Sequence, residues 1–270
     1  MSKIILLGCD PEMFTRDQHG RISSVAGLLG CDKWNKRFFS ETIRIQEDNV
    51  LVEYDTNPQP TLDLFSKNIQ EGINACAQVV GEVGLELAEG ICSHIYTMDE
   101  LNSFNKSVFM FGCEPDYNAL TGATNPKPAA ADPGLRTAGG HVHFGYEEHL
   151  DSLGMDLARS QTVMGVMCDY HLGLPALLID GDDRRRELYG KAGAVRLKPY
   201  GIEYRTLSNF WTFKEDTRKL VWDQGHKAFS TLSGEWERLV NLVSPEDVQR
   251  AINNNDKRMA EEFLKILKVI

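Results

Sequence analysis

Histidines and carboxylates that recur two positions apart are the residues of this chain best suited to chemistry. His141 and His143 alternate with the apolar Val142 and Phe144, and residues i and i+2 of a strand project from the same face. Glycines on both sides of this segment let other groups approach the backbone closely. Two imidazoles on one strand face suit a metal or phosphate site, and a hydrogen-bonded pair in a polar cleft is the alternative.

A pair of acids has the same spacing near the start of the chain. Asp10 and Glu12 follow an apolar strand predicted over residues 3–9. Pro11 favours an extended conformation in the residue before it, which would hold Asp10 outward. These acids are therefore candidate metal ligands, and solvated acids in a strand-ending Asp-Pro turn are the alternative.

Two further acids lie within strand-like segments. Glu53 interrupts an apolar run, and a buried carboxylate needs a cation or hydrogen bonds. Glu203 shares a predicted strand face with Arg205, two positions on. Glu53 and Glu203 can therefore point into a functional cleft.

Arginines concentrate in residues 180–206 of this otherwise acidic chain. The planar arginine side chain binds phosphate and carboxylate groups through two hydrogen bonds. Arg196 and Arg205 lie in apolar, strand-like settings that favour such a role, whereas Arg184 and Arg185 also fit a solvated salt-bridge surface.

Carboxylates outnumber imidazoles among these candidates, which favours Mg²⁺ or Mn²⁺ over a structural zinc ion. Magnesium held by carboxylates usually also binds substrate phosphates. Together with the arginines, this indicates nucleotide-dependent phosphoryl transfer. The sequence contains neither a P-loop nor a Rossmann glycine motif.

The elements that must position these residues are predicted from apolar periodicity. Helices are expected from 61 to about 83, from 151 to about 177, and as C-terminal support over about 214–270. A strand is expected over 107–113, followed by a functional loop over 118–135.

Composition limits the class of protein. The chain has 270 residues, 42% hydrophobic and 25% charged, which is typical of a globular protein and fits one catalytic domain over 1–270. Its net charge of −10 argues against non-specific binding of nucleic acid or anionic membranes. Scattered cysteines, and an N-terminal apolar run too short for a signal peptide, predict a cytoplasmic protein with no membrane span.

Four sequence blocks in order resemble a known superfamily. The series of acids and histidines is similar to the metal site of glutamine synthetase and glutamate–cysteine ligase, and the full blocks most resemble the phage-type COOH–NH2 ligase (amidoligase) family. The blocks are Gly8-Cys9-Asp10-Pro11-Glu12-Met13-Phe14 with Val52-Glu53, Arg136-x-Ala-Gly-Gly-His141-x-His143-x-Gly145, Tyr189-Gly-x-x-Gly193-x-x-Arg196, and Glu203-Tyr-Arg205-Thr-Leu-Ser-Asn-x-Trp211. The resemblance covers residues 4 to about 213.

This resemblance implies an α+β fold, in which a curved, mostly antiparallel sheet carries helices on its outer face and the site in its concavity. It also implies an ATP- and Mg²⁺-dependent ligase. In such enzymes ATP phosphorylates a carboxylate, and an amine then attacks the acyl phosphate to form an amide. The substrates would be a small-molecule or peptide carboxylate and amine, and the enzyme would act in the host cytoplasm if it is phage-encoded.

The resemblance also implies roles for individual residues. Glu12 and Glu53 would hold the metal ion nearer the substrate carboxylate. Asp10, His141 and Glu203 would hold the ion that bridges the nucleotide phosphates. Arg205 would stabilise the transferring phosphoryl group, and Arg196, Arg186, His143 and Tyr189 would contact nucleotide or substrate. Relatives that make glutamine have Glu where this chain has Asp10, and the shorter side chain shifts the metal or leaves a water between them.

Two other functions fit the same residues: a metal-dependent hydrolase or nuclease, and a non-catalytic nucleotide-binding relic. In the ligase hypothesis, neutralising Asp10 or Glu203 abolishes activity and leaves folding intact or improved, because unpaired acids repel. The sequence identifies neither substrate and indicates no oligomeric state.

Overall fold

The computed structural model describes residues 5–109, 116–125 and 132–269, and its centre is an antiparallel β-sheet. Eight strands form this sheet, and every pairing between them is antiparallel. In spatial order they are β4 (Arg37–Phe38), β5 (Ile43–Asp48), β6 (Leu51–Thr56), β1 (Leu6–Met13), β11 (Gly140–Gly145), β13 (Gly201–Tyr204), β12 (Ala194–Lys198) and β9 (Tyr117–Asn118).

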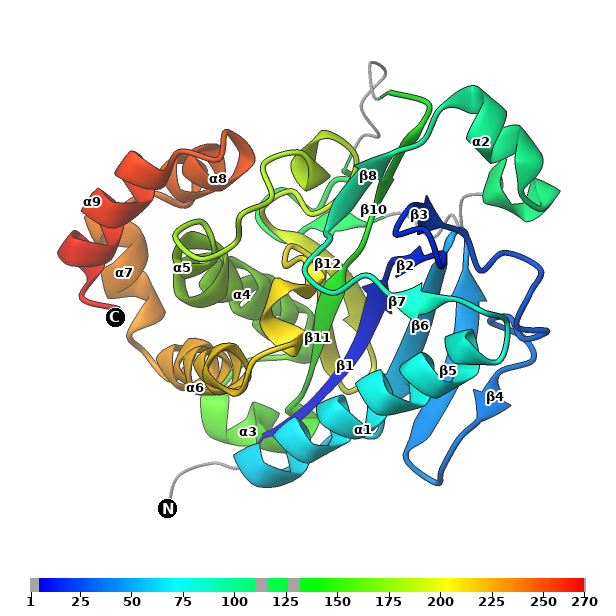
Figure 1. Ribbon diagram of the computed structural model, residues 1–270. Helices are drawn as coiled ribbons and strands as arrows, with labels where there is room; N and C mark the ends of the chain where they lie inside the picture. The colour runs from blue at the N-terminus through cyan, green and yellow to red at the C-terminus, as the bar shows by residue number, and fades with distance from the viewer. Residues whose placement is uncertain (1–4, 110–115, 126–131, 270) are drawn as a thin grey trace.

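Helices cover one face of this sheet. The helix α1 (Leu62–Gly81) lies across β1, β6 and β5 (Figure 1), while α4 (Leu157–Cys168) packs on β13 and against α6 (Glu215–Thr231). Alternate strand residues such as Val142 and Tyr204 are fully buried on this side. The sheet with helices on one face confirms the predicted fold class.

Close packing of α1 on the sheet depends on Gly72. A Cβ atom at Gly72 would lie 2.2 Å from the ring of Tyr54, so any larger residue would push the helix off strand β6. The helix begins where the sequence indicates, because the Thr61 hydroxyl accepts a hydrogen bond from the Leu64 N–H at 3.4 Å.

Smaller elements surround the sheet. Two short sheets lie beyond the end of β1: β3 (Ile22–Ser23), β2 (Thr15–Arg16) and β7 (Glu86–Leu87), and β10 (Leu135–Thr137) with β8 (Ser93–Ile95). The remaining helices are α2 (Met98–Ser103), α3 (Leu150–Leu153), α5 (Leu174–Ala176), α7 (Trp236–Leu242), α8 (Pro245–Asn253) and α9 (Lys257–Leu267), with 3₁₀ turns at Lys106–Phe109, Glu147–His149, Arg185–Glu187 and Asn209–Thr212 and a π-turn at Asp169–Gly173.

The predicted helices at 61–83, 151–177 and 214–270 are confirmed, with breaks in the last two. The strand predicted over 107–113 is wrong in its described part, because Lys106–Phe109 forms a 3₁₀ turn; residues 110–113 lie outside the described residues. Part of the loop predicted over 118–135 also lies outside them.

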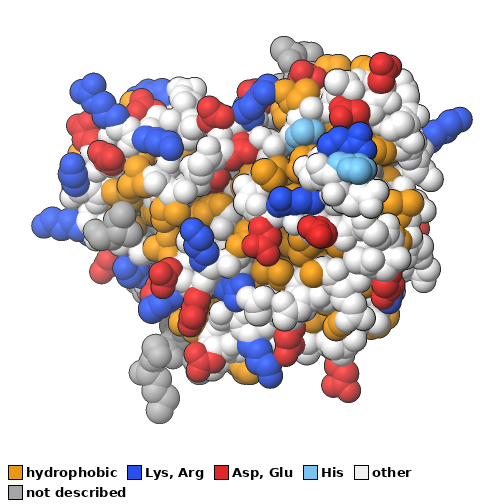
Figure 2. Space-filling view, in the orientation of Figure 1, with side chains coloured by type: hydrophobic (Ala, Val, Ile, Leu, Met, Phe, Trp, Pro, Cys, Tyr) orange, Lys and Arg blue, Asp and Glu red, His pale blue; other side chains and the backbone are white. Residues whose placement is uncertain are grey.

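The distribution of charged side chains and the polarity of the helices agree with the expectations from composition. Acidic and basic side chains are intermixed over the face shown in Figure 2, so positive charge is dispersed there. Within the described part of the chain, no helix is both long and apolar enough to cross a membrane.

Candidate active site

The face of the sheet opposite the helices brings the predicted ligands together. Strand pairing sets Asp10 opposite His141, His143 opposite Glu203, and Glu12 opposite Glu53. Because strand residues alternate between faces, all of these side chains point away from the helices. They line a cleft of about 1070 Å³.

The first group, here called the histidine cluster, consists of Asp10, His141 and Glu203. Each of these residues offers a ligand atom, and these atoms lie within 4.8 Å of one another. His141 Nδ1 lies 3.3 Å from Asp10 Oδ1 and 4.0 Å from Glu203 Oε1. His143 borders the cluster, with its Nε2 3.2 Å from Asp10 Oδ1 and its Nδ1 2.7 Å from the Tyr200 hydroxyl.

Three cationic side chains converge on Glu203, whose side chain is fully buried. Arg196 Nη1 lies 3.0 Å from Glu203 Oε1, Lys198 Nζ lies 2.9 Å from Oε2, and Arg205 also pairs with Oε1. Burial and Asp10 raise the pKa of Glu203, but Arg205 and the histidines outweigh them and lower it to about 2. The expectation that Glu203 is an unpaired, repelling acid is therefore wrong.

Asp10 is the other acid of the histidine cluster. Burial raises its pKa, but His143 and His141 outweigh this effect and hold the pKa well below the ordinary value. Both acids of this cluster are thus stabilised as carboxylates by positive or hydrogen-bonding neighbours.

The second group, here called the three-acid cluster, consists of Glu12, Asp48 and Glu53, with ligand atoms also within 4.8 Å of one another. Its hydrogen-bond donors are neutral. The Gly139 N–H donates to Glu12 Oε2 at 2.6 Å, and the Gln46 amide donates to Glu53 Oε2 at 2.6 Å. Burial and the neighbouring acids raise the pKa of Glu53 well above its ordinary value and that of Asp48 to about 6.

Both clusters fit a divalent cation by their chemistry. Carboxylate oxygens are the ligands that Mg²⁺ and Mn²⁺ prefer, and imidazole is an acceptable minority ligand. Asp10 Oδ1 is buried and has no hydrogen-bond partner in the described residues, although it lies close to two imidazole nitrogens. An oxygen in this position suits a metal ligand. The three-acid cluster likewise concentrates carboxylates whose mutual repulsion a cation would relieve.

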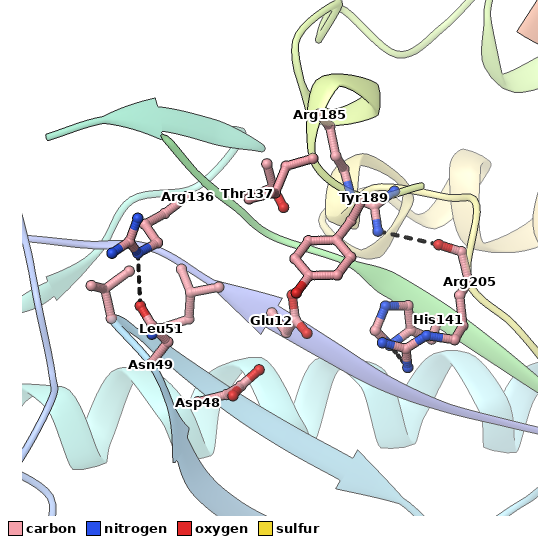
Figure 3. Close-up of a pocket in the computed structure, with 12 residues that line it drawn as sticks. Glu12, Asp48, Asn49, Leu51, Arg136, Thr137, His141, Arg185, Tyr189 and Arg205 are labelled. Carbon is pink, nitrogen blue, oxygen red and sulfur yellow. Dashed lines mark hydrogen bonds between the residues drawn. The ribbon is translucent and has the colours of Figure 1, made fainter. Parts of the chain in front are cut away.

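Beside the clusters, a smaller pocket of about 70 Å³ contains several of the predicted side chains. Figure 3 shows the Tyr189 ring projecting into it between Arg205 and Glu12. Arg205 is held from behind by Asp116, with Nε 2.5 Å from Oδ1. Tyr189 and Arg205 therefore line one pocket together with His141 and the acids Glu12 and Asp48.

One predicted residue does not reach the site. Arg186 is buried away from both cavities, with its Nη1 3.4 Å from Asn255 Oδ1. Its neighbour Arg185 lines the smaller pocket instead, and is buried through hydrogen bonds to the carbonyls of Ala138 and Thr206. The solvated-surface alternative is thus wrong for Arg185, and the assignment of Arg186 to the cleft is not supported. The 3₁₀ turn at Arg185–Glu187 decides which arginine faces the sheet.

Asp48 and Lys198 belong to the site but are not among the residues predicted from the sequence. Asp48 ends a strand in which Arg44, Gln46 and Asp48 alternate with the buried Ile43 and Ile45. This period-two pattern could have placed Asp48 on the polar face. Lys198 lies two residues after Arg196 on β12 and so shares its strand face, but its contact with Glu203 depends on the pairing of β12 with β13.

The fold and the site define an α+β protein with two carboxylate-rich clusters and an arginine group on the open face of an antiparallel sheet. Residues 134–263 match the family described as phage phiEco32-like COOH.NH2 ligase-type 2, in agreement with the family that the sequence blocks resemble.

A solved structure described as a novel glutamine synthase homolog aligns with 98% of this chain at 13% identity and a TM-score of 0.38. The chain spans 65% of the length of that structure. No curated protein matches the chain.

Proposed function

We propose that this protein is an ATP- and Mg²⁺-dependent ligase that joins a carboxylate to an amine through an acyl phosphate. The observation that carries the proposal is the pair of clusters side by side on one sheet face, with three cationic side chains paired with Glu203 of the histidine cluster. A phosphoryl-transfer site needs such an arrangement, because charge neutralisation supplies most of the catalysis. The family name, a COOH.NH2 ligase, supports the same reaction class.

The histidine cluster suits the nucleotide phosphates. Asp10, His141 and Glu203 would hold one Mg²⁺ (Mn²⁺ is an alternative). Arg196, Lys198 and Arg205 now pair with Glu203 or Asp116. In the complex their positive ends would also face phosphate oxygens, while His143 and Tyr189 would border the nucleotide.

The three-acid cluster suits the carboxylate substrate. Glu12 and Glu53, joined by Asp48, would hold the second Mg²⁺. A bound divalent cation supplies positive charge that lowers the repulsion between a substrate carboxylate and the phosphates. Because Asp10 and Glu12 are two residues apart on β1, the two sites share one rigid strand.

The proposed reaction needs only ATP, a carboxylate and an amine as reactants. A carboxylate oxygen attacks the terminal phosphorus of ATP and ADP leaves. The amine nitrogen then attacks the acyl carbon, phosphate leaves, and the amine loses a proton. Arg205, held by Asp116, is placed to stabilise the charge that develops on the transferring phosphoryl group.

To test this proposal, the purified protein is incubated with ATP, Mg²⁺ and pools of amino acids and amines. The release of ADP and phosphate and the mass of any product are then measured. ADP that forms only when a carboxylate and an amine are both present, with a product lighter than their sum by one water, would support the proposal. Nucleotide-independent cleavage would identify a hydrolase, and tight nucleotide binding without turnover would identify a relic. Glu71→Gln, on an exposed side chain of α1, is the matched control for Glu53→Gln.

A further inference from the structure

A tryptophan projects into solvent at the rim of the cleft. The side chain of Trp34 is 85% exposed, in a protein whose other large aromatic side chains are mostly buried. The turn that carries it is closed by two backbone hydrogen bonds that Asp32 and Asn35 exchange. Asp32 Oδ1 also accepts from the Trp34 N–H at 2.8 Å. A rigid turn thus displays an apolar ring that folding does not bury.

More aromatic surface follows along the chain. Phe38 is 74% exposed and Phe39 is 40% exposed, and β4, which contains Phe38, is an edge strand of the described sheet. Exposed aromatic residues near a cleft are typical of surfaces that bind another protein. Trp34, Phe38 and Phe39 are here called the aromatic rim.

The aromatic rim reaches the candidate active site through Trp34. Trp34, Lys33 and Lys36 line the same cleft as the two acid clusters. Strand β4 is separated from β6, which carries Glu53, by β5 alone. Two strand spacings amount to roughly 10 Å. A polypeptide that covers the rim therefore lies within a few residues of the three-acid cluster.

Cations beside the rim define the charge of the ligand. Lys33 Nζ lies 4.8 Å from the centre of the Trp34 ring. Lys36 and Arg44 share a single carboxylate, that of Asp55, with Lys36 Nζ 2.6 Å from its Oδ2. Within this group of three side chains, two cations on one acid leave one positive charge that a carboxylate of the ligand can neutralise.

From this surface we infer that the ligase acts on a polypeptide, which lays an apolar side chain on Trp34 and Phe38 and an acidic side chain near Lys33 and Lys36. A free amino acid would occupy only the cleft, whereas a polypeptide also covers the rim outside it. The inference that the aromatic rim binds a polypeptide depends only on the surface residues described above. That the bound polypeptide carries one of the two groups joined rests on the proposed function.

The test pans a random dodecapeptide phage-display library on the full chain without nucleotide, then measures synthesised peptides by fluorescence anisotropy. Enriched peptides should combine Asp or Glu with an aromatic residue or Leu. Trp34→Ala should weaken their binding at least about tenfold, as expected for a central aromatic contact. Phe38→Ser and Lys36→Met should weaken it less, and Ile266→Ala, an exposed apolar side chain on α9, should leave it unchanged.

Failure to enrich such peptides, or equal binding by Trp34→Ala, would overturn the inference. A Trp34-dependent dimer in sedimentation, without peptide binding, would overturn it in favour of a second copy of this chain. Because the readout needs no turnover, peptide binding with no ADP formation would refute only the proposed function. ADP formation from free amino acids with no peptide binding would refute only the inference that the protein binds a polypeptide.

Discussion

The histidine cluster and the three-acid cluster lie two residues apart on β1, yet their surroundings differ in charge. Glu203 has three cationic partners, and its pKa falls to about 2. Glu53 receives a neutral amide donor, and its pKa rises well above the ordinary value. The carboxylates of the histidine cluster are thus balanced by cations of the chain itself, whereas Glu12 and Glu53 accept hydrogen bonds from neutral donors, and a bound cation would offset their repulsion.

This difference shows why carboxylates of the same type can affect the stability of the folded protein differently in the two clusters. Neutralising an acid removes attraction where cations surround it and removes repulsion where other acids surround it. Variants that are chemically alike should therefore change activity in the same direction and stability in opposite directions.

The largest expected effect is on turnover. Glu203→Gln and Glu53→Gln should each lower ATP-dependent product formation by about 1000-fold, because each removes a charged ligand from a site that stabilises phosphoryl transfer. Steady-state ADP release measures this loss, with Glu71→Gln as the control. Full turnover in either variant would show that its cluster is not part of the reaction.

The next effect is a loss of stability confined to the histidine cluster. Glu203→Gln leaves Arg196, Lys198 and Arg205 without their shared carboxylate, and breaking a buried pair in this way should lower the free energy of unfolding by about 3 kcal/mol. Glu53→Gln should instead raise it by about 1 kcal/mol in EDTA, because it relieves repulsion with Glu12 and Asp48. Urea unfolding measures the free energy of unfolding of both variants. A change of the same sign in both would show that the two clusters do not differ in this way.

Magnesium should then act mainly on the three-acid cluster. A ligand at 100 times its Kd stabilises the folded state by about 2.7 kcal/mol. Wild-type protein should gain stability on this scale with Mg²⁺, and Glu53→Gln should lose most of the gain. Thermal unfolding with and without EDTA measures it; an equal gain in both proteins would place the cation elsewhere.

The smallest expected effect is on the dependence of stability on pH. Asp48 has a folded-state pKa raised from 3.8 to about 6, so the folded state binds more protons than the unfolded state between these values, and stability falls as pH rises through that window. In EDTA, the advantage of Asp48→Asn over wild type should therefore grow by about 2 kcal/mol from pH 4 to pH 7. Glu203 has the opposite sign: its stabilisation is present above 4.5 and is lost as pH falls toward 2. Urea unfolding at each pH tests both directions, and a pH-independent difference for Asp48→Asn would contradict the raised pKa.

The sequence by itself determined which residues share a strand face. Alternation at 10 and 12, at 141 and 143, and at 203 and 205 depends only on the local geometry of a strand, and a threonine cap followed by periodic apolar residues is enough to begin α1 at Leu62. The blocks of motif residues also predicted the family whose model matches residues 134–263.

Only the tertiary structure decided how those faces meet. Asp48 joins Glu12 and Glu53 because β5 pairs with β6, Lys198 reaches Glu203 because β12 pairs with β13, and Arg185 replaces Arg186 because a 3₁₀ turn orients it toward the sheet. Register between distant strands and the direction of a side chain leaving a turn are set by packing across the whole core. No local pattern of residues contains that information.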